Sequence, residues 1–225
     1  EEALAEAMAK PPEVLEWGAN HKRVRKVTPE RDNQGKVRLR TVEYTELASG
    51  LAYQDEKGAW RDSVAEFELV DGRVISRRTQ HKAILAASPL ANDAVDLMLP
   101  DGNRLKSRVL GLGYFDPVTG ESVTIAEIRD AQAELSERKD ELYYLEAFQG
   151  EGISADLRYR LRISGIEQDV IFLKQPPGPE QYGLSAESQL EVITEFFPSA
   201  EPVLTQRVVR EEKDPARRAA VAEPD

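Results

Sequence analysis

Three arginines at alternating positions are the side chains of this sequence that are best arranged to bind an anion. Arg158, Arg160 and Arg162 alternate with apolar residues between positions 157 and 163. On a β-strand such residues share one face and lie about 6.6–7 Å apart, so three guanidinium groups could hold a polyanion or a row of carboxylates. More often, such a row is a solvated face or pairs with acids of the adjacent strand. If the chain binds a glycan instead, we expect that binding to depend on Tyr159 and Arg160.

A second cationic stripe is indicated between residues 21 and 40. This segment has eight Lys or Arg against two acids, a local charge of +6, whereas residues 41–70 have seven acids against two cations, a local charge of −5. Arg38 and Arg40 could bind an acidic glycan or a phosphate. The favoured alternative is that neighbouring strands of opposite sign pair their charges across the solvent face, at about 0.2–1 kcal/mol for each pair.

The sequence contains few of the residues that nucleophilic or metal-dependent catalysis uses. Cysteine is absent, which excludes a thiol nucleophile, a thiolate zinc site and an iron–sulfur cluster, and the only histidines are His21 and His81. The Gly-x-Ser-x-Gly elbow, the phosphate loop, the dinucleotide fingerprint and the calcium loop are all missing. We therefore expect no catalytic residue, no metal and no cofactor.

Two pairs of glutamates could line a groove on a single strand face. They are Glu66/Glu68 and Glu191/Glu195. A glycosidase needs two carboxyl groups roughly 5–10 Å apart across the sugar. With 41 acids in the chain, chance supplies such pairs, so they are weak evidence for hydrolysis.

Composition narrows the class of partner. The chain has 225 residues, which suits one large domain or two small ones, and a net charge of −11. The negative field disfavours nucleic acid and anionic lipid as general partners. No apolar stretch approaches the roughly 20 residues that span a bilayer, so membrane insertion is not expected.

Turn residues recur along the whole chain. Each turn contains Gly, and all but one combine it with Asp, Asn or Ser, residues that favour turns. The expected turns are Asp32–Gly35, Ser49–Gly50, Asp55–Gly58, Asp71–Gly72, Asp101–Asn103, Asp116–Gly120, Gln149–Gly152 and Ser164–Gly165. Between them, apolar residues alternate with polar ones at 95–99, 122–125, 157–163 and 189–196. This period of two predicts antiparallel hairpins with one buried face.

Three segments leave the local structure open. Val37 and Leu39 are out of phase with Val42 and Tyr44, which a β-bulge near Arg40–Thr41 would reconcile. Residues 128–145 permit either a helix or a strand. At the end of the 189–196 segment, the adjacent Phe196 and Phe197 indicate burial on both faces, and hence a central strand or a contact with a further domain.

The fold expected from these patterns is all-β: an antiparallel, two-sheet, sandwich-like domain at residues 14–209. A short N-terminal helix or linker is expected at residues 1–13, because the segment is rich in Ala and Glu and ends at two prolines. Residues 210–225 are charged and free of aromatics, which indicates a mobile tail or linker.

Several short sequence segments together resemble a region of a known class of protein. They are Gly50–Trp60, Ala94–Leu97, Pro100–Leu105, Gly111–Asp116, Thr119–Gly120, Gly165–Val170 and Pro176–Leu184. The chain from about 20 to 200 resembles the N-terminal β-rich region of large secreted bacterial proteins, often ones with Rhs/YD-type repeats further along. The resemblance rests on turn and core residues and brings no catalytic set. It implies export or display at the bacterial cell surface, a neighbouring domain after Asp225, and a role in surface architecture or recognition.

The function expected is therefore a non-catalytic, extracellular structural or interaction module of a larger assembly, whose partners are neighbouring domains or protein subunits. One alternative is a β-sandwich that binds or acts on carbohydrate, with a glycan as partner. Another is a self-assembling subunit of a fibre or sheath, in which the chain ends donate strands to neighbours.

Overall fold

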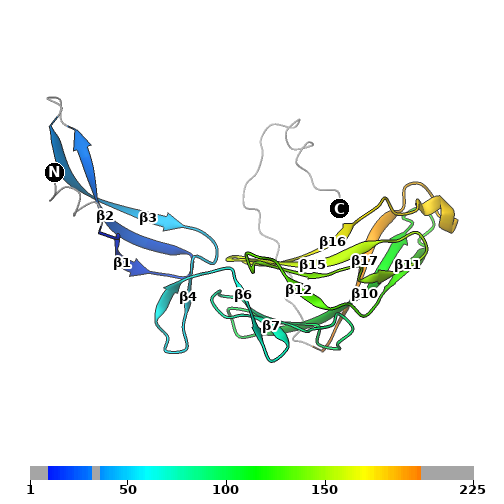
Figure 1. Ribbon diagram of the computed structural model, residues 1–225. Helices are drawn as coiled ribbons and strands as arrows, with labels where there is room; N and C mark the ends of the chain where they lie inside the picture. Colours follow the sequence, from blue (N-terminus) through cyan, green and yellow to red (C-terminus); the bar gives the residue numbers. More distant parts are fainter. Residues whose placement is uncertain (1–9, 32–35, 199–225) are drawn as a thin grey trace.

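The chain folds into antiparallel β-sheets that form two visibly different parts, an arm and a body (Figure 1). The computed structural model describes residues 10–31 and 36–198. The expectation of an all-β chain is confirmed, and within these residues the only helix is the single 3₁₀ turn η1 (Pro179–Tyr182). No helix in this part of the chain has the length and apolarity needed to cross a membrane.

The arm is the three-stranded sheet at the N-terminal end, in the order β1-β2-β3. Its strands are β1 (Glu13–Trp17), β2 (His21–Arg31) and β3 (Val37–Leu47). Next along the chain, β4 (Ala52–Gln54) and β5 (Trp60–Asp62) form a separate hairpin. Figure 1 shows the arm extending away from the rest of the molecule, with the β4–β5 hairpin at its base.

The body contains two larger sheets. The eight-stranded sheet comprises β6 (Phe67–Val70), β7 (Arg73–Ser76), β8 (Lys82–Leu85), β9 (Val95–Met98), β10 (Arg104–Phe115), β11 (Ser122–Ile128), β14 (Phe148–Gln149) and β17 (Gln189–Phe196). The four-stranded sheet comprises β12 (Ala133–Leu135), β13 (Glu141–Tyr144), β15 (Ala155–Arg162) and β16 (Gly165–Phe172). Residues 128–145, for which helix or strand was open, contain β12 and β13 and no helix.

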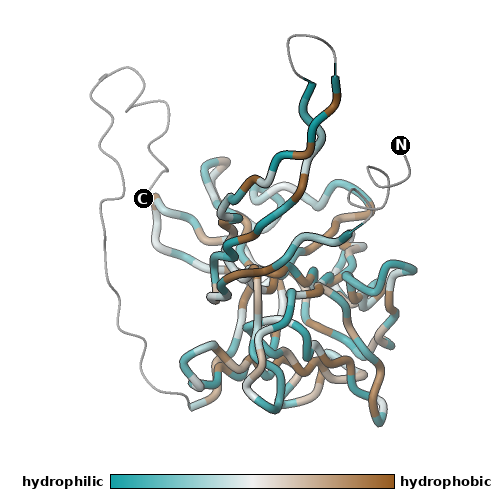
Figure 2. Tube along the Cα trace, turned by 90° about the vertical axis from the view of Figure 1, so that its left-hand side faces the viewer, coloured by the Kyte–Doolittle hydropathy of each residue, from teal (hydrophilic) through white to brown (hydrophobic). Residues whose placement is uncertain are grey.

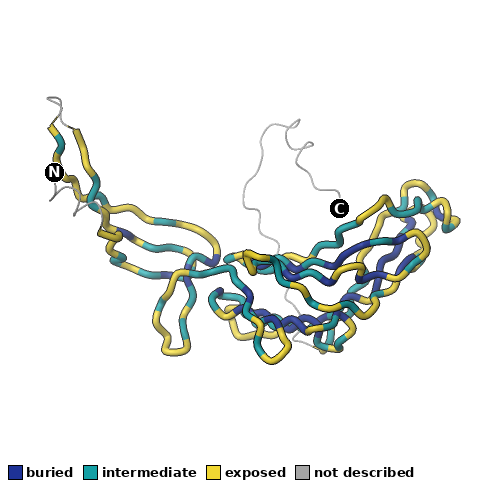
Figure 3. Tube along the Cα trace, viewed as in Figure 1, coloured by how far each residue is buried: buried dark blue, intermediate teal, exposed yellow. Residues whose placement is uncertain are grey.

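The core of the body takes side chains from both of these sheets. Leu85 and Leu112 of the eight-stranded sheet belong to the same buried cluster as Leu142, Leu157 and Leu161 of the four-stranded sheet. Figure 3 shows the buried residues concentrated in the body, whereas most of the arm is exposed or intermediate. The alternation predicted at 157–163 is confirmed, because the apolar positions of β15 are buried and the arginines between them are not.

The bulge predicted near Arg40–Thr41 is wrong. The β2–β3 ladder runs without interruption from His21 opposite Leu47 to Arg31 opposite Val37. The prediction assumed that one face of β3 must be buried, which would require the apolar residues to keep one phase. Both faces of the arm meet solvent instead, so a change of phase needs no correction, and Figure 2 shows polar and apolar residues interleaved along it.

The central position predicted for β17 is also wrong. Within residues 10–31 and 36–198 this strand pairs with β10 alone, whose other side is occupied by β9 and β11, so β17 is an edge strand there. The face expected to be buried is partly exposed, with Leu190 and Val192 at 41% and Phe196 at 60%. Phe197 lies beneath the guanidinium group of Arg108, 5.7 Å from the ring centre, and this contact accounts for the second aromatic.

Other predictions fall at the ends of the chain. Residues 1–9 and 210–225, which hold most of the expected N-terminal helix and all of the expected tail, lie outside the described residues. Lys10 to Pro12 are not helical, and β1 begins at Glu13.

A joint of five residues connects the arm to the body: Ala19, Asn20, Gly50, Ala52 and Gln80. The Gln80 side-chain amide donates to the carbonyl oxygens of Ala19, at 2.5 Å, and Ala52, at 2.8 Å. The Asn20 side-chain oxygen accepts from the Gly50 backbone N–H at 2.8 Å. These bonds tie the turn between β1 and β2 and the turn after β3 to the loop before β8, which fixes where the arm leaves the body.

Gly50 is required at this joint for two reasons. Its φ of +73° is disfavoured for residues with a Cβ, and a Cβ built there would lie 1.8 Å from the carbonyl oxygen of Ile163 in the β15–β16 turn. The predicted turn at Ser49–Gly50 therefore also brings the arm's base into close contact with the body.

Candidate functional site

The arginine row of β15 is built as predicted, with the three side chains on the face opposite the core. Arg158 contacts Asp169 of β16 at 2.9 Å and Glu141 of β13 at 3.3 Å. Arg160 donates from Nε to the same Glu141 carboxylate at 2.6 Å. The acids come from the two strands that flank β15, which is the pairing that the sequence left open as an alternative to ligand binding.

The charges on this face cancel. The third arginine, Arg162, lies 3.3 Å from Glu167 of β16, so the row faces three carboxylates in all. The Tyr143 hydroxyl, which donates to Glu141 at 2.7 Å, and the Arg160 guanidinium beside it lower the pKa of Glu141, although burial opposes them. Glu141 therefore stays ionised at neutral pH, and the ladder leaves no net positive charge for a polyanion.

Tyr159 is not part of the arginine surface. It lies on the other face of β15, is 4% exposed, and packs edge to face against Tyr144 with ring centres 6.2 Å apart. Its hydroxyl donates to the Gln168 side-chain oxygen at 2.9 Å. The alternation that aligns the arginines already places Tyr159 opposite them, so the sequence contained the signal that separates these residues.

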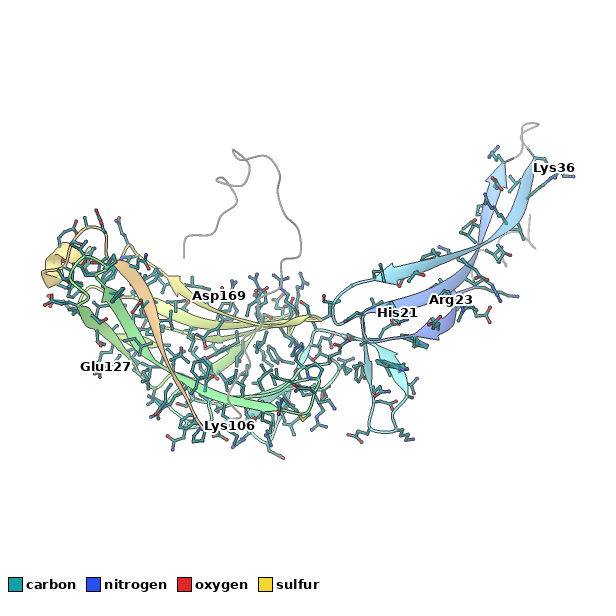
Figure 4. All side chains as sticks on the ribbon, turned by 180° about the vertical axis from the view of Figure 1, so that it is seen from behind. His21, Arg23, Lys36, Lys106, Glu127 and Asp169 are labelled. Carbon is teal, nitrogen blue, oxygen red and sulfur yellow. The ribbon has the colours of Figure 1, made fainter. Side chains whose placement is uncertain are left out.

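Arg38 and Arg40 lie on β3, in the half of the arm furthest from the joint. Arg40 is 3.4 Å from Glu30 of β2, and Arg38 stands opposite Glu30 in the ladder and also has a bonding partner. Figure 4 shows the arm from behind, with Arg23 midway along it and Lys36 near its far end, well away from Glu127 on the body. The two arginines are thus on one projecting element that is remote from the β15 row.

Cross-strand ion pairs hold the half of the arm nearest the joint. Arg25 of β2 lies 2.9 Å from Glu43 of β3 and 3.2 Å from Glu13 of β1. Lys22 lies 3.2 Å from Glu46 of β3 and 2.7 Å from Asp62 of β5. The opposite charges of segments 21–40 and 41–70 therefore pair here, as the favoured interpretation of the basic stripe predicts.

The pKa values of the two cations follow from these contacts. Burial alone would lower the pKa of Lys22, but hydrogen bonds to Asp62 and Glu46 outweigh it, and the pKa is raised. The Glu43 carboxylate raises the pKa of Arg25 by hydrogen bonding and by its charge. Both cations stay charged across the physiological range, so the ladder is not a pH switch near neutrality.

The arm exposes apolar side chains and an unpaired strand edge. Val24 is its only buried strand residue, and on β3 the exposed fractions of Leu39, Tyr44 and Leu47 are 47%, 39% and 77%. Within the described residues β3 pairs with β2 alone, so the backbone groups on its other side, over eleven residues, face no strand. Such an edge can accept a strand from a partner.

The residues considered for catalysis do not converge. Glu66 and Glu68 both contact Arg78, and Glu195 contacts Arg108 at 2.7 Å, so each candidate pair is engaged by an arginine. His21 begins β2 and lies 3.5 Å from Glu16 of β1, and His81 precedes β8. In the part of the chain that the structure describes, no group of three or more His, Asp or Glu residues is placed to hold a metal ion.

Comparison with known proteins finds no matching family, no matching curated protein and no matching solved structure. The resemblance to the β-rich region of secreted bacterial proteins therefore stays a prediction from the sequence.

Proposed function

We propose that the protein is a non-catalytic interaction module of a larger secreted or cell-surface bacterial assembly, and that its arm docks on a neighbouring domain or protein subunit. The single observation that carries this proposal is the exposure of the arm on both faces and along the edge of β3. The secreted location rests on the sequence resemblance alone.

The physical argument concerns what stabilises the arm. A small sheet without a buried face is only marginally stable in water, and here Leu39, Tyr44 and Leu47 add exposed apolar surface. A partner that covers this surface would bury it at roughly 25 cal/mol per Å² of apolar area. An added strand on β3 would also satisfy the free backbone groups of the edge, with side chains at alternate positions giving specificity.

The body would then serve as the rigid base that presents the arm. We propose that its two larger sheets pack as a sandwich, an arrangement supported by the single buried cluster to which both contribute. The joint at Gly50 and Gln80 would hold the arm at a fixed angle to that base.

The carbohydrate alternative has less support. Its two candidate contacts, Tyr159 and Arg160, lie on opposite faces of β15, and Arg160 is already paired with Glu141. The self-assembly alternative is kept as an outcome of the experiment below.

The experiment places a photo-crosslinking amino acid at Leu39 or Tyr44 of the arm and, as a matched control, at Leu69 of the body, which is 69% exposed. The full-length protein is irradiated in its native host, and adducts are identified by mass spectrometry. We expect one protein partner from both arm positions, none from Leu69, and loss of the Tyr44 adduct when Leu39→Arg is added. The same adduct must then form between the purified protein and the purified partner.

Two outcomes overturn the proposal. Adducts of the same partners from the arm and from Leu69 would mean that the arm is not the docking element. Adducts that contain only a second copy of this chain would replace an external partner with self-assembly.

A further inference from the structure

A groove of about 660 Å³ lies between the β4–β5 hairpin and the outer face of the eight-stranded sheet. Its floor is apolar: Ile75 of β7 stands opposite Ile84 of β8, and Met98 of β9 stands opposite Lys82. Because Val74 and Leu85 on the other face are buried in the core, this floor is the outer side of the sheet. Tyr53 of β4 belongs to the opposite wall.

The groove is cationic, in contrast to the chain as a whole. Its charged lining residues are six cations, Lys57, Arg61, Arg77, Arg78, Lys82 and Arg104, and three acids, Asp55, Glu56 and Asp96. The sum is +3, whereas the whole chain carries −11. An anion approaching this protein therefore meets a local field of the opposite sign to the overall one.

Two of the three acids are already engaged. Asp96, whose side chain is 4% exposed, accepts from Arg104 Nε at 3.0 Å and holds that guanidinium group at one end of the groove. Asp55 accepts from the backbone N–H groups of Lys57 and Ala59, at 3.0 and 2.9 Å, and from Arg61 at 3.0 Å. These bonds order the turn that forms the groove's wall, so neither acid competes with a ligand.

Three of the cations have no such partner. Within residues 10–31 and 36–198, no acid lies in ion-pair distance of Lys57, Arg77 or Lys82. Lys57 comes from the hairpin wall, and Arg77 and Lys82 come from the sheet side, so the uncommitted charges flank the apolar floor. Elsewhere the molecule pairs its arginine rows with acids, which makes this cluster unlike the ladders of β2 and β15.

We propose that this groove binds a small amphipathic organic anion, whose apolar body lies on Ile75, Ile84 and Met98 and whose acidic group is held by Lys82 and Arg77. The volume falls in the range of pockets that bind small molecules, and apolar walls with a few placed charged groups are typical of them. An acidic polysaccharide would bring hydroxyl groups onto the aliphatic floor, which leaves them without hydrogen-bond partners there.

The site goes beyond the proposed docking role of the arm. The groove is lined by residues 53–104, none of which belongs to β1, β2 or β3. Binding at the groove and docking by the arm can therefore succeed or fail separately.

The test uses decanoate as the probe and decylammonium, with the same alkyl chain and the opposite charge, as the matched control. Binding to the full-length protein is measured by calorimetry below the micellar concentration. Methyl NMR reports the location, because Met98 is one of only two methionines in the chain. We expect decanoate to bind and to shift the Met98 methyl signal, and decylammonium to do neither.

Two variants test which cations hold the carboxylate group of decanoate. The double variant Arg77→Gln/Lys82→Gln is expected to weaken decanoate binding by about tenfold or more, because it removes both charge-assisted hydrogen bonds to the carboxylate. Lys174→Gln, which removes an exposed cation outside the groove, should leave the affinity unchanged. Thermal unfolding of each variant checks that the fold is retained.

Three results would overturn the proposal. They are equal binding of decanoate and decylammonium, an equal loss in the Lys174→Gln variant, and binding of oligogalacturonate at the groove without binding of decanoate, which would make the ligand an acidic glycan. Failure of these assays would leave the crosslinking result from the arm intact, so the two proposals are distinguished.

Discussion

The arm and the body use the same antiparallel ladder, but different forces hold their strands together. In the body, Leu85, Leu112 and Leu157 are 1% exposed or less, and each fully buried side chain of this size contributes roughly 1.5–3 kcal/mol. Among the described strand residues of the arm, only Val24 is buried, and ion pairs such as Arg25–Glu43 link the strands. Exposed ion pairs contribute between 0 and about 1 kcal/mol each.

The two parts differ in how strictly burial fixes the alternation of apolar and polar residues along a strand. A buried face forces one phase of alternation, as on β15, whereas the exposed strand β3 can change phase between Leu39 and Val42 at no cost. The arm therefore depends on its charges and on the joint for order, and the body depends on its core. Each prediction below tests one side of this comparison.

The largest expected effect is in the core of the body. Leu157→Ala should lower the free energy of unfolding by about 2–5 kcal/mol, because the substitution removes buried apolar contacts and leaves a cavity. Leu47→Ala in the arm, where the side chain is 77% exposed, should change it by no more than about 0.5 kcal/mol. Urea unfolding measures both. Similar losses in the two variants would mean that arm and body do not differ as described.

The next effect concerns the joint between the two parts. Gly50→Ala and Gly58→Ala place a Cβ at nearly the same backbone angle, φ +73° and +76°, but only the first meets an obstacle, the Ile163 carbonyl oxygen. Both should lose about 1 kcal/mol from left-handed strain. Gly50→Ala should lose roughly 1–3 kcal/mol more from the clash. Urea unfolding gives the difference between the two variants.

Hydrogen exchange shows where the loss from Gly50→Ala falls. Faster exchange confined to residues 18–52 would place it at the joint and the arm. Equal stability of the Gly50→Ala and Gly58→Ala variants would contradict the close contact between the arm's base and the body.

An acid-dependent effect is expected from a buried carboxyl group of the body. Asp116, 1% exposed, accepts from the Ser185 N–H and hydroxyl, both at 2.9 Å, and from the Val118 N–H at 2.8 Å. These bonds, that from the Ser185 N–H first, lower the pKa of Asp116 although burial opposes them. A carboxyl group with a lowered pKa in the folded state contributes stability above its ordinary value near 4. That contribution is lost as the pH falls through the folded pKa.

Unfolding curves between pH 7 and pH 2 test this expectation. The wild-type protein should lose more stability on acidification than Asp116→Asn, and the difference should develop only below about pH 4. A difference that stayed constant down to pH 2 would show that the ionised carboxylate is not what the Ser185 and Val118 groups stabilise. Arm ion pairs such as Arg40–Glu30 are exposed and should add little to the curve.

Much of the body could be predicted from the sequence, because its turns and its alternation follow from local chemistry. In the body, glycines at the predicted turns do have positive φ at positions 72, 102, 120 and 152. Alternation also placed the arginines of β15 on one face. What it could not provide was their neighbours: that Glu141 and Asp169 flank β15 depends on the order of strands in the sheet, which a single sequence does not encode locally.

The groove was invisible in the sequence for the same reason. Lys57, Arg77 and Lys82 belong to three separate local patterns, and none of them has a spacing that indicates a site. They come together because the β4–β5 hairpin lies over the outer face of β7 and β8. The charge contrast of segments 21–40 and 41–70, on the other hand, was a usable signal, since adjacent strands of opposite sign pair wherever a hairpin joins them.

The smallest effect is expected from a single ion pair in the arm. Arg25→Gln removes contacts to Glu43 and Glu13 at once, and amide exchange of residues 37–47 should accelerate by roughly twofold to fivefold at low salt. In 1 M NaCl, where the screening length is about 3 Å, wild-type and variant arms should exchange alike. Arg158→Gln in the body has pairs of similar length, but the strands there are also held by the core, so exchange of β16 should not respond to salt. An arm that ignores salt would mean that the backbone ladder and the joint hold it without its charges, and the contrast between the two parts would then reduce to burial alone.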